Sequence, residues 1–341
     1  MSGPPAGPST APSVKALGKV TIVGAGKAGL TVATALAGAN VAMLTLICRD
    51  TERRAAIQSW IHGCRASGQV PAAASTTWQV RAAGHADCRD ADTVLFATAD
   101  RDLTDAALSW QQQQATGGQQ VWLHLSGVSD PARLCVPGGA RDLGSAHPLA
   151  ALPDPLAIEK NPQGFPDVMQ AIAPLNGAFF ALAGSPAALA RGDALAHSLG
   201  GYGRRVALEQ RAGYHAAAAV VANDLVGLMA VGEALAVAAG LEAAEARRAL
   251  LHLAQTSLGA LGAIATAPGA SLAHGLTGAV GRGDALTLAA HLEALAGNQD
   301  GLLAHAALSR ILLELVQRAG LLDARAAADL AQVLKPAARQ P

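Results

Sequence analysis

The chain has 341 residues, of which 51% are hydrophobic and 15% are charged, so it is long enough to bury two domain cores and too apolar to be disordered overall. Lysine plus arginine and aspartate plus glutamate each number 25, and the formal net charge of +0 argues against a nucleic-acid partner. No continuous apolar stretch reaches the ~20 residues of a membrane span, so we expect no membrane insertion. The ten histidines form no ligand cluster, so we expect no metal site.

The start of the chain and its cysteines bear on location. Residues 1–18 are predicted to be a disordered tail, because the first twelve residues are rich in Pro, Ser and Gly and lack the features of a signal peptide. The four cysteines form no Cys-x-x-Cys pair, which favours reduced thiols and a cytoplasmic location. They are Cys48, Cys64, Cys88 and Cys135.

A glycine-rich turn follows the first predicted strand, residues 20–23, and precedes a helix-forming stretch at 30–39. Its glycines, Gly24, Gly26 and Gly29, have the spacing Gly-x-Gly-x-x-Gly. In a dinucleotide site the first glycine permits the tight turn, the second lets the backbone approach a pyrophosphate, and the third allows the helix to pack closely. We predict a nicotinamide cofactor bound here, with Lys27 beside it; a purely structural turn is the alternative.

Strand-like and helix-like segments alternate as far as residue 208. The further predicted strands are 41–48, 93–97, 121–125, 179–182 and 204–208, with a helix at 186–199. This alternation is typical of a parallel, doubly wound α/β sheet. Five prolines between residues 149 and 174 predict a linker or a long covering loop.

The chain from residue 209 to 336 is rich in alanine and leucine at helical spacing. The predicted helices are 211–239, 243–264, 285–296, 302–319 and 324–333. We therefore expect an all-helical second domain. Its small apolar faces suit a subunit interface, so we expect a homodimer, although a bias in composition would give the same pattern.

The residues after the second strand bear on cofactor choice, because an acid there favours a free 2′-hydroxyl and an arginine favours a 2′-phosphate. If the strand ends by Cys48, Arg49 with Arg53 or Arg54 would form a phosphate clamp. If it runs one residue longer, Asp50 would favour NAD(H). We prefer NADP(H); arginines that merely solvate a helix start are the other possibility.

Polar side chains also follow the later strands, where ligands bind in open α/β sheets. Thr98 would pass beneath the nicotinamide ribose, and Ser126 would contact the cofactor and hydrogen-bond a substrate. Asp100 is equally a helix cap. His147, fixed by Pro148, would reach the nicotinamide or the substrate, or would serve only as a loop anchor.

Two residues of the first long helix are candidates for catalysis. His215 and Asn223 are eight residues apart, about 80° around a helix axis, so they face one side while Tyr214 points elsewhere. Histidine titrates near neutral pH, so His215 is a candidate proton donor, with Asn223 holding a carbonyl or imine. A core histidine bonded to a backbone carbonyl is the alternative.

The segment 277–284 contains three glycines and carries Arg282, a natural partner for a substrate carboxylate. Two local alternatives remain open. Arg282 and Asp284 would pair with each other, or Asp284 would cap the helix that starts at Ala285.

Several of these segments occur together in an order that resembles a known family. They are 24–29, 124–127, 144–149, 214–218 with Asn223, and 276–284 with His291. Over roughly residues 19–295 the chain is similar to the family that joins a Rossmann-like half to the domain of unknown function 2520. This family lies among the β-hydroxyacid dehydrogenase relatives, which include ketopantoate reductase, pyrroline-5-carboxylate reductase and the imine reductases.

The resemblance implies an NADP-dependent oxidoreductase with a Rossmann-type domain at 19–208. It also implies a helical domain at 209–336, like the C-terminal domain of 6-phosphogluconate dehydrogenase, which dimerises and leaves the active site in the cleft between the domains. One departure matters: the dehydrogenase relatives commonly carry Lys-x-x-x-Asn with lysine as acid and base, whereas here Ala219 precedes Asn223. Alcohol oxidation through that lysine is therefore not supported, and reduction of a C=N bond stays open.

Together these features predict a reductase that transfers hydride from NADPH to a small carbonyl or imine compound bearing an anionic group. A module that binds NADP or a metabolite without turnover is the main alternative. A purely structural scaffold would bind no nucleotide at all.

Overall fold

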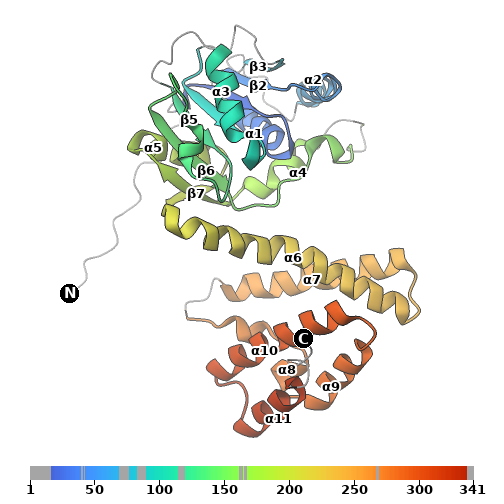
Figure 1. Ribbon diagram of the computed structural model, residues 1–341. Coiled ribbons are helices and arrows are strands. Elements are labelled where there is room, and N and C mark those ends of the chain that lie inside the picture. Colours follow the sequence, from blue (N-terminus) through green and yellow to red (C-terminus); the bar gives the residue numbers. More distant parts are fainter. Residues whose placement is uncertain are drawn as a thin grey trace, which may run out of the picture. The chain divides into compact units, whose positions relative to one another are not determined.

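The computed structural model describes residues 17–39, 41, 43–68, 77–82, 90–113, 120–160, 164, 167–265 and 269–335, and Figure 1 shows the chain in sequence colours. Most of the predicted tail, and Cys88, lie outside the described residues. The chain divides into two compact units, Met1–Ala218 and Ala219–Pro341. The division falls inside helix α6 (Arg211–Ala238).

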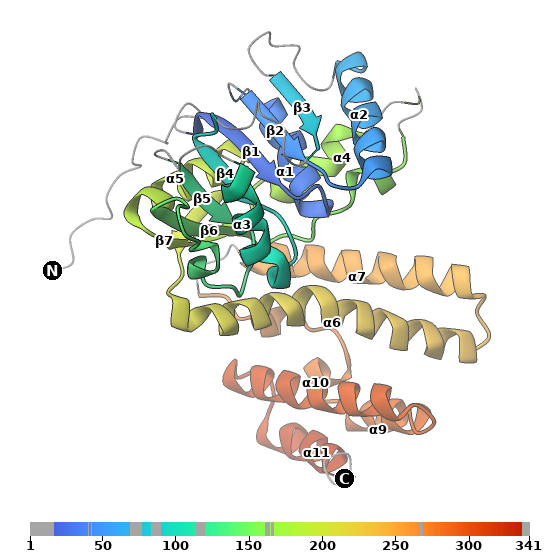
Figure 2. The ribbon, with the colours of Figure 1, turned by 45° about the horizontal axis from the view of Figure 1, so that its top comes forward.

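The first unit is built on one eight-stranded sheet of order β3-β2-β1-β4-β5-β6-β7-β8, most of which can be followed in Figure 2. The strands are β1 (Lys19–Val23), β2 (Met43–Ile47), β3 (Thr77–Arg81), β4 (Thr93–Phe96), β5 (Val121–His124), β6 (Asp142–Pro148), β7 (Phe179–Gly184) and β8 (Tyr202–Arg205). Strand β1 lies inside the sheet: β2 and β3 follow on one side of it and β4 and β5 on the other, so the order of the strands reverses between β1 and β4. Such a reversal is the point where doubly wound sheets bind ligands, and the predicted Rossmann-type class is confirmed.

Strand β7 runs antiparallel to β6, which departs from the parallel sheet expected from the sequence. The chain leaves β6 at Pro148, and the next N–H, that of Leu149, donates to the Phe179 carbonyl at 2.8 Å, where β7 begins. Strand β7 therefore starts at the edge where β6 stops and has to run back along it. All the other paired strands are parallel among the described residues.

Helices cover both faces of this sheet. They are α1 (Lys27–Gly38), α2 (Thr51–Ala66), α3 (Leu103–Gln113), α4 (Val168–Ile172) and α5 (Pro186–Ser198). One hydrophobic core joins the sheet to α1, α2, α4 and α5, and a second joins it to α3. Helix α1 is buried from Gly29 to Ala37, because this stretch contains only Gly, Ala, Leu, Thr and Val. In the second core Phe96 and Trp122 meet edge to face at 5.4 Å. Both cores hold the carboxyl ends of the central strands in place.

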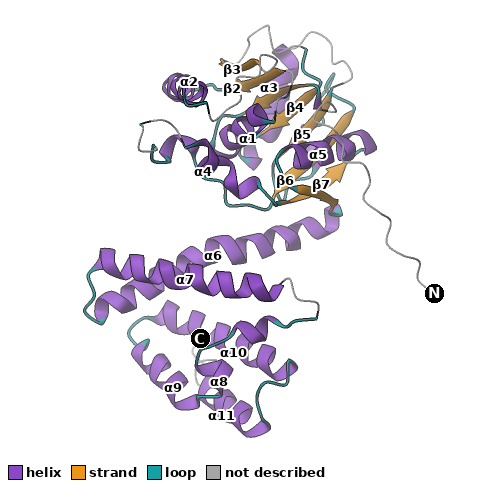
Figure 3. Cartoon of the chain, turned by 180° about the vertical axis from the view of Figure 1, so that it is seen from behind, coloured by secondary structure: helices purple, strands orange, loops and turns teal. Residues whose placement is uncertain are grey.

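The described part of the second unit consists of helices and loops, as Figure 3 shows. Besides the rest of α6, its helices are α7 (Ala243–Ala265), α8 (Ala279–Arg282), α9 (Ala285–Ala294), α10 (Gln299–Arg318) and α11 (Ala324–Leu334). The five helices expected from the sequence are confirmed, and the short α8 is an addition. A core of side chains such as Leu288, Leu313 and Leu330 joins α8 to α11.

Although no unbroken apolar stretch of ~20 residues occurs in the sequence, one helix of the described residues is long and apolar enough on average to cross a membrane. Residues Leu208–Ala238 reach a mean hydropathy of 1.7 over their most apolar window, and none of that window is buried. One such helix is weak evidence for a membrane span. The exposed apolar surface of α6 nevertheless needs a physical explanation, because water does not stabilise it.

Candidate active site

The glycine turn between β1 and α1 packs tightly against the end of β4. Gly24 has φ +110°, and a Cβ atom there would lie 2.6 Å from the Ala97 carbonyl oxygen. A Cβ atom on Gly29 would overlap the carbonyl oxygen of Gly24. Two of the three glycines are therefore required by packing alone.

Gly26 is different, because a Cβ atom there would meet no atom within 4 Å. Its backbone is extended, with φ −73° and ψ −169°, a conformation that any residue adopts. Packing thus gives no reason for glycine at this position. An open approach to the backbone at the N-terminus of α1 is what a bound pyrophosphate requires.

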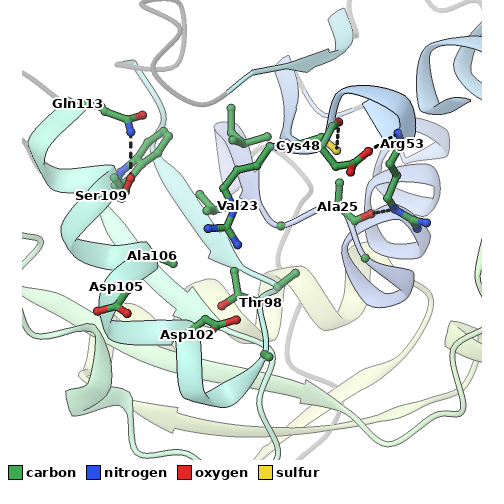
Figure 4. A pocket seen from close by; sticks show the side chains of 18 residues that line it. Val23, Ala25, Cys48, Arg53, Thr98, Asp102, Asp105, Ala106, Ser109 and Gln113 are labelled. Carbon is green, nitrogen blue, oxygen red and sulfur yellow. Dashed lines mark hydrogen bonds between the residues drawn. The ribbon is translucent and has the colours of Figure 1, made fainter. Parts of the chain in front are cut away.

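A cavity of about 470 Å³ opens at the carboxyl ends of β1, β2 and β4. Figure 4 shows its two sides: Asp102, Asp105, Ser109 and other side chains near or on α3 face the side that carries Ala25, Cys48 and Arg53. Of the predicted cofactor residues, Gly24, Gly26, Arg49, Arg53 and Thr98 line the cavity. Lys27, Gly29 and Ser126 do not line it.

The end of β2 places an arginine at this cavity. The strand stops at Ile47, and the Asp50 carboxylate caps α2 by accepting the Arg53 backbone N–H at 2.6 Å. Arg49 is exposed and lines the cavity between these two points. Arg54 does not line the cavity, and its guanidinium donates to the Cys48 carbonyl at 3.0 Å.

Arg53 lines the cavity but has protein partners for its guanidinium. Its Nη1 and Nη2 atoms donate to the two carboxylate oxygens of Asp154, each at 3.0 Å, and its Nε donates to the Ala25 carbonyl. Burial opposes ionisation of the Asp154 carboxyl, but the hydrogen bonds from Arg53 and from the Leu156 backbone outweigh it and lower the pKa of Asp154. The phosphate clamp predicted from the sequence for Arg49 with Arg53 is therefore not formed, because Asp154 and Ala25 hold the Arg53 guanidinium.

A second group of polar side chains, which we call the histidine cluster, consists of His124, His147, Arg211, Tyr214 and His215. It lies at the ends of β5 and β6 and at the start of α6, entirely within the first unit. His147 Nδ1 and the Tyr214 hydroxyl are 3.0 Å apart, and the rings of His147 and His215 meet edge to face at 5.7 Å. Tyr214 and His215 point in different directions from the helix, as expected, but both contact His147, which comes from strand β6.

Burial sets the protonation of three members of this cluster, His124, His147 and Tyr214. It lowers the pKa of His147 to about 4, with further contributions from His215 and Arg211, and lowers the pKa of His124 to about 4, with a contribution from Arg211. It also raises the pKa of Tyr214 to about 12. At neutral pH His124 and His147 are uncharged and the tyrosine keeps its proton.

Arg211 is almost fully buried and bonds to the loop after β5. Its Nη2 donates to the Ser126 carbonyl at 2.6 Å, and its Nε and Nη1 have no hydrogen-bond partner in the described part of the chain. The Ser126 hydroxyl accepts the N–H of Ser129 at 3.0 Å. Ser126 therefore shapes its own loop and anchors Arg211 through its carbonyl.

The atoms packed around Gly127 explain why the loop after β5 carries a glycine at this position. A Cβ atom there would overlap His215 Nδ1 and lie 3.0 Å from His147 Nε2, so the two imidazole rings occupy the place of a side chain.

Gly127→Ala is therefore expected to lower the free energy of unfolding by about 1–3 kcal/mol, measured by urea denaturation. Gly213→Ala is the matched control, because nothing lies within 4 Å of a Cβ at that helical site, and it should stabilise by about 0.5–1 kcal/mol. Equal effects at both positions would contradict the packing of the rings on Gly127.

The other predicted residues lie in the second unit. Asn223 is exposed on α6. Arg282 donates to the Thr277 carbonyl and lies 4.0 Å from the Asp284 carboxylate. Asp284 caps α9 by accepting the Thr287 N–H at 3.0 Å, so both local interactions left open by the sequence are present. Among the described residues, no group of three or more His, Cys, Asp or Glu side chains is placed to hold a metal.

Comparison with known proteins agrees with this architecture. Residues 178–319 match the family model "Domain of unknown function (DUF2520)", so the resemblance to that family is confirmed over this segment. No curated protein matches the chain.

Several solved structures share the fold. Protein TM1727 from Thermotoga maritima is 18% identical with a TM-score of 0.59, and the match covers 88% of this chain and 98% of that one. The "putative NADP oxidoreductase BF3122" from Bacteroides fragilis is 16% identical with a TM-score of 0.56, covering 88% and 99%. An NADH-preferring ketol-acid reductoisomerase from an uncultured archean is 15% identical with a TM-score of 0.52, covering 94% and 92%. At these identities the similarity establishes the fold.

Proposed function

We propose that the chain is an NADP(H)-dependent oxidoreductase that reduces a small carbonyl or imine compound bearing an anionic group. The observation that carries the proposal is Gly26, a glycine that packing does not require, which lines a cavity of about 470 Å³ where the order of the strands reverses. Dinucleotides bind at this point of a doubly wound sheet. The names of the Bacteroides and archaeal structures, an NADP oxidoreductase and a reductoisomerase that prefers NADH, support the same class.

In this proposal the chain binds and orients the cofactor, which supplies the hydride when bound. The turn at Gly24 and Gly26 would hold the pyrophosphate at the N-terminus of α1, and Thr98 would support the ribose. Arg49, which follows the last residues of β2, would pair with a 2′-phosphate, so we propose a preference for NADP(H). NAD(H) is the alternative cofactor, because among the described residues Arg49 is the one cavity-lining arginine without an ion pair, and the cavity also carries acidic side chains.

The histidine cluster would supply the proton that balances hydride transfer. The pKa of His147 is about 4, so at pH 7 its imidazole is neutral and is not the group that donates this proton. We propose His215 as the donor, held beside His147 over Gly127. Ser126, Asn223 and Arg282 stay predictions as substrate contacts; Arg282 would suit a carboxylate.

We also propose a homodimer formed through the helical unit, located in the cytoplasm. Helix α6 carries three valine side chains that are each more than 60% exposed, Val220, Val221 and Val226. A second copy of the chain packed on this helix would bury them. Asn223 and Asp224 lie on the same stretch of helix and are exposed as well. Polar side chains at mid-helix are costly in lipid, so a protein interface accounts for this surface better than a membrane does.

A binding module without turnover is the second candidate. It is favoured by Ala219, which stands where the dehydrogenase relatives carry the acid-base lysine. Such a protein would bind the cofactor through the same cavity and respond to the ratio of its oxidised and reduced forms.

Turnover separates the two candidates. Purified protein is mixed with NADPH and a panel of 2-oxo acids and carboxylated cyclic imines, and loss of the reduced nicotinamide absorbance is followed. We expect consumption with at least one class, and His215→Ala should lower the rate by about a hundredfold with unchanged NADPH affinity. An unchanged rate removes His215 from the mechanism. Tight binding of NADPH with no consumption across the panel would favour the binding module.

A further inference from the structure

The Arg53 side chain connects three segments that meet at the cofactor cavity. It arises from the first turn of α2, bonds to Ala25 in the glycine turn, and is held by Asp154, 101 residues further along the chain. Asp154 also caps the short 3₁₀ helix η5 (Pro155–Ala157) by accepting the Leu156 N–H. The preceding residue, Pro153, accepts a hydrogen bond from the Thr31 hydroxyl at 3.2 Å. The proline-rich covering segment is thus tied to the cavity wall through Arg53.

Asp154 offsets the positive charge of Arg53 at the wall of the cavity. The side chains of Arg53 and Asp154 are 29% and 20% exposed, so solvent only partly screens them. Both terminal nitrogens of Arg53 are aligned on the two carboxylate oxygens, which is the strongest geometry for an arginine and a carboxylate. An anion in the cavity therefore meets an Arg53 guanidinium that is already paired with Asp154, while Lys27 also lies close enough to act on that carboxylate.

Arg49 offers the contrast. It lines the same cavity, is exposed, and makes no side-chain ion pair with the described residues. A 2′-phosphate in the cavity would thus be recognised by Arg49, while Arg53 stays paired with Asp154.

We propose that Asp154 is a specificity-determining residue, which weakens recognition of the 2′-phosphate by withholding Arg53 from it. The inference rests on the proposed function, because it assumes that the cavity binds the adenosine end of a nicotinamide dinucleotide. Its consequence is that the chain discriminates less between phosphorylated and unphosphorylated dinucleotides than its two arginines would permit.

The test uses two probes that differ only in the 2′-phosphate, namely 2′,5′-ADP and 5′-AMP, titrated by calorimetry into wild type and Asp154→Asn. Asparagine removes the charge but retains an oxygen for the Leu156 N–H. We expect Asp154→Asn to raise the affinity ratio of 2′,5′-ADP to 5′-AMP by about tenfold, because the freed guanidinium can pair with the phosphate. The double variant Asp154→Asn/Arg53→Met should return the ratio to the wild-type value.

Asp105→Asn is the matched control, since it removes a negative charge from the same cavity without releasing an arginine. An increase no larger than that of Asp105→Asn would overturn the proposal by reducing it to a general effect of charge. If Asp154→Asn does not fold, Asp154→Ser takes its place, because its hydroxyl can accept the Leu156 N–H while carrying no charge. A ratio no higher than that of wild type in this variant would overturn the proposal. Wild type that binds neither NADPH nor NADH would instead refute the proposed function, while binding with an unmoved ratio refutes only the role of Asp154.

Discussion

Gly26→Val is expected to weaken NADPH binding at least tenfold, a loss of about 1.4 kcal/mol or more, while the protein stays folded. A Cβ at this position meets no protein atom within 4 Å and Gly26 lines the cavity, so the added side chain has room in the fold but would compete with a ligand bound at the turn. The change also replaces glycine at the start of α1, which should lower the free energy of unfolding by at most about 1 kcal/mol. Fluorescence titration with NADPH and urea denaturation measure the two effects.

Whereas Gly26→Val acts chiefly on NADPH binding, Gly29→Ala, in the same turn, is expected to act chiefly on the stability of the fold. Its Cβ would overlap the Gly24 carbonyl oxygen, which belongs to the backbone and cannot turn aside. We expect a loss of about 3 kcal/mol or more in the free energy of unfolding. If instead Gly26→Val unfolds the protein, or leaves NADPH affinity unchanged, Gly26 is not the residue that leaves room for a ligand.

The folded protein is expected to lose stability between about pH 6.5 and pH 4, because of the buried histidines. His124 is fully buried, and its pKa falls from 6.5 to about 4 on folding, chiefly through burial. In this window the unfolded chain binds a proton that the folded chain excludes, so acid favours unfolding. His124 alone contributes on the order of 3 kcal/mol that is present above pH 6.5 and lost as the pH falls towards 4.

His147 acts in the same direction, since burial also lowers its pKa to about 4. Urea denaturation at a series of pH values measures the combined slope. His124→Asn is the control, because its amide oxygen can accept the Ser126 N–H, which now bonds to His124 Nδ1 at 3.1 Å, yet it does not titrate. A slope that is equally steep in His124→Asn would show that other groups cause the acid sensitivity.

The sequence predicted those features that depend on local spacing. The glycine turn, the presence of a second strand within 41–48 and the long helices follow from patterns within one element, and the structure contains them. The exact end of that strand, at Ile47, was left open by the sequence. Strand β3 was missed, although Trp78 and Val80 point into the core and alternate with Gln79, because five residues give too short a pattern.

The site depended on contacts that no local pattern encodes. Arg53 meets Asp154 over 101 residues, Arg211 meets Ser126 over 85, and His147 meets Tyr214 over 67. Helical spacing correctly separates Tyr214 from His215 by direction, but it does not show that His147 lies within reach of both. Arginine pairing was therefore misjudged where a distant carboxylate decides it, as at Arg53.

The measurement that tests the central claim most directly is a titration of the purified protein with NADPH and with NADH, followed by nicotinamide fluorescence. The account predicts saturable binding of both, tighter for NADPH, with the preference removed by Arg49→Ala because that side chain lines the cavity and makes no ion pair with the described residues. Failure of either dinucleotide to bind at millimolar concentration would contradict the account and leave the glycine turn with a structural role alone.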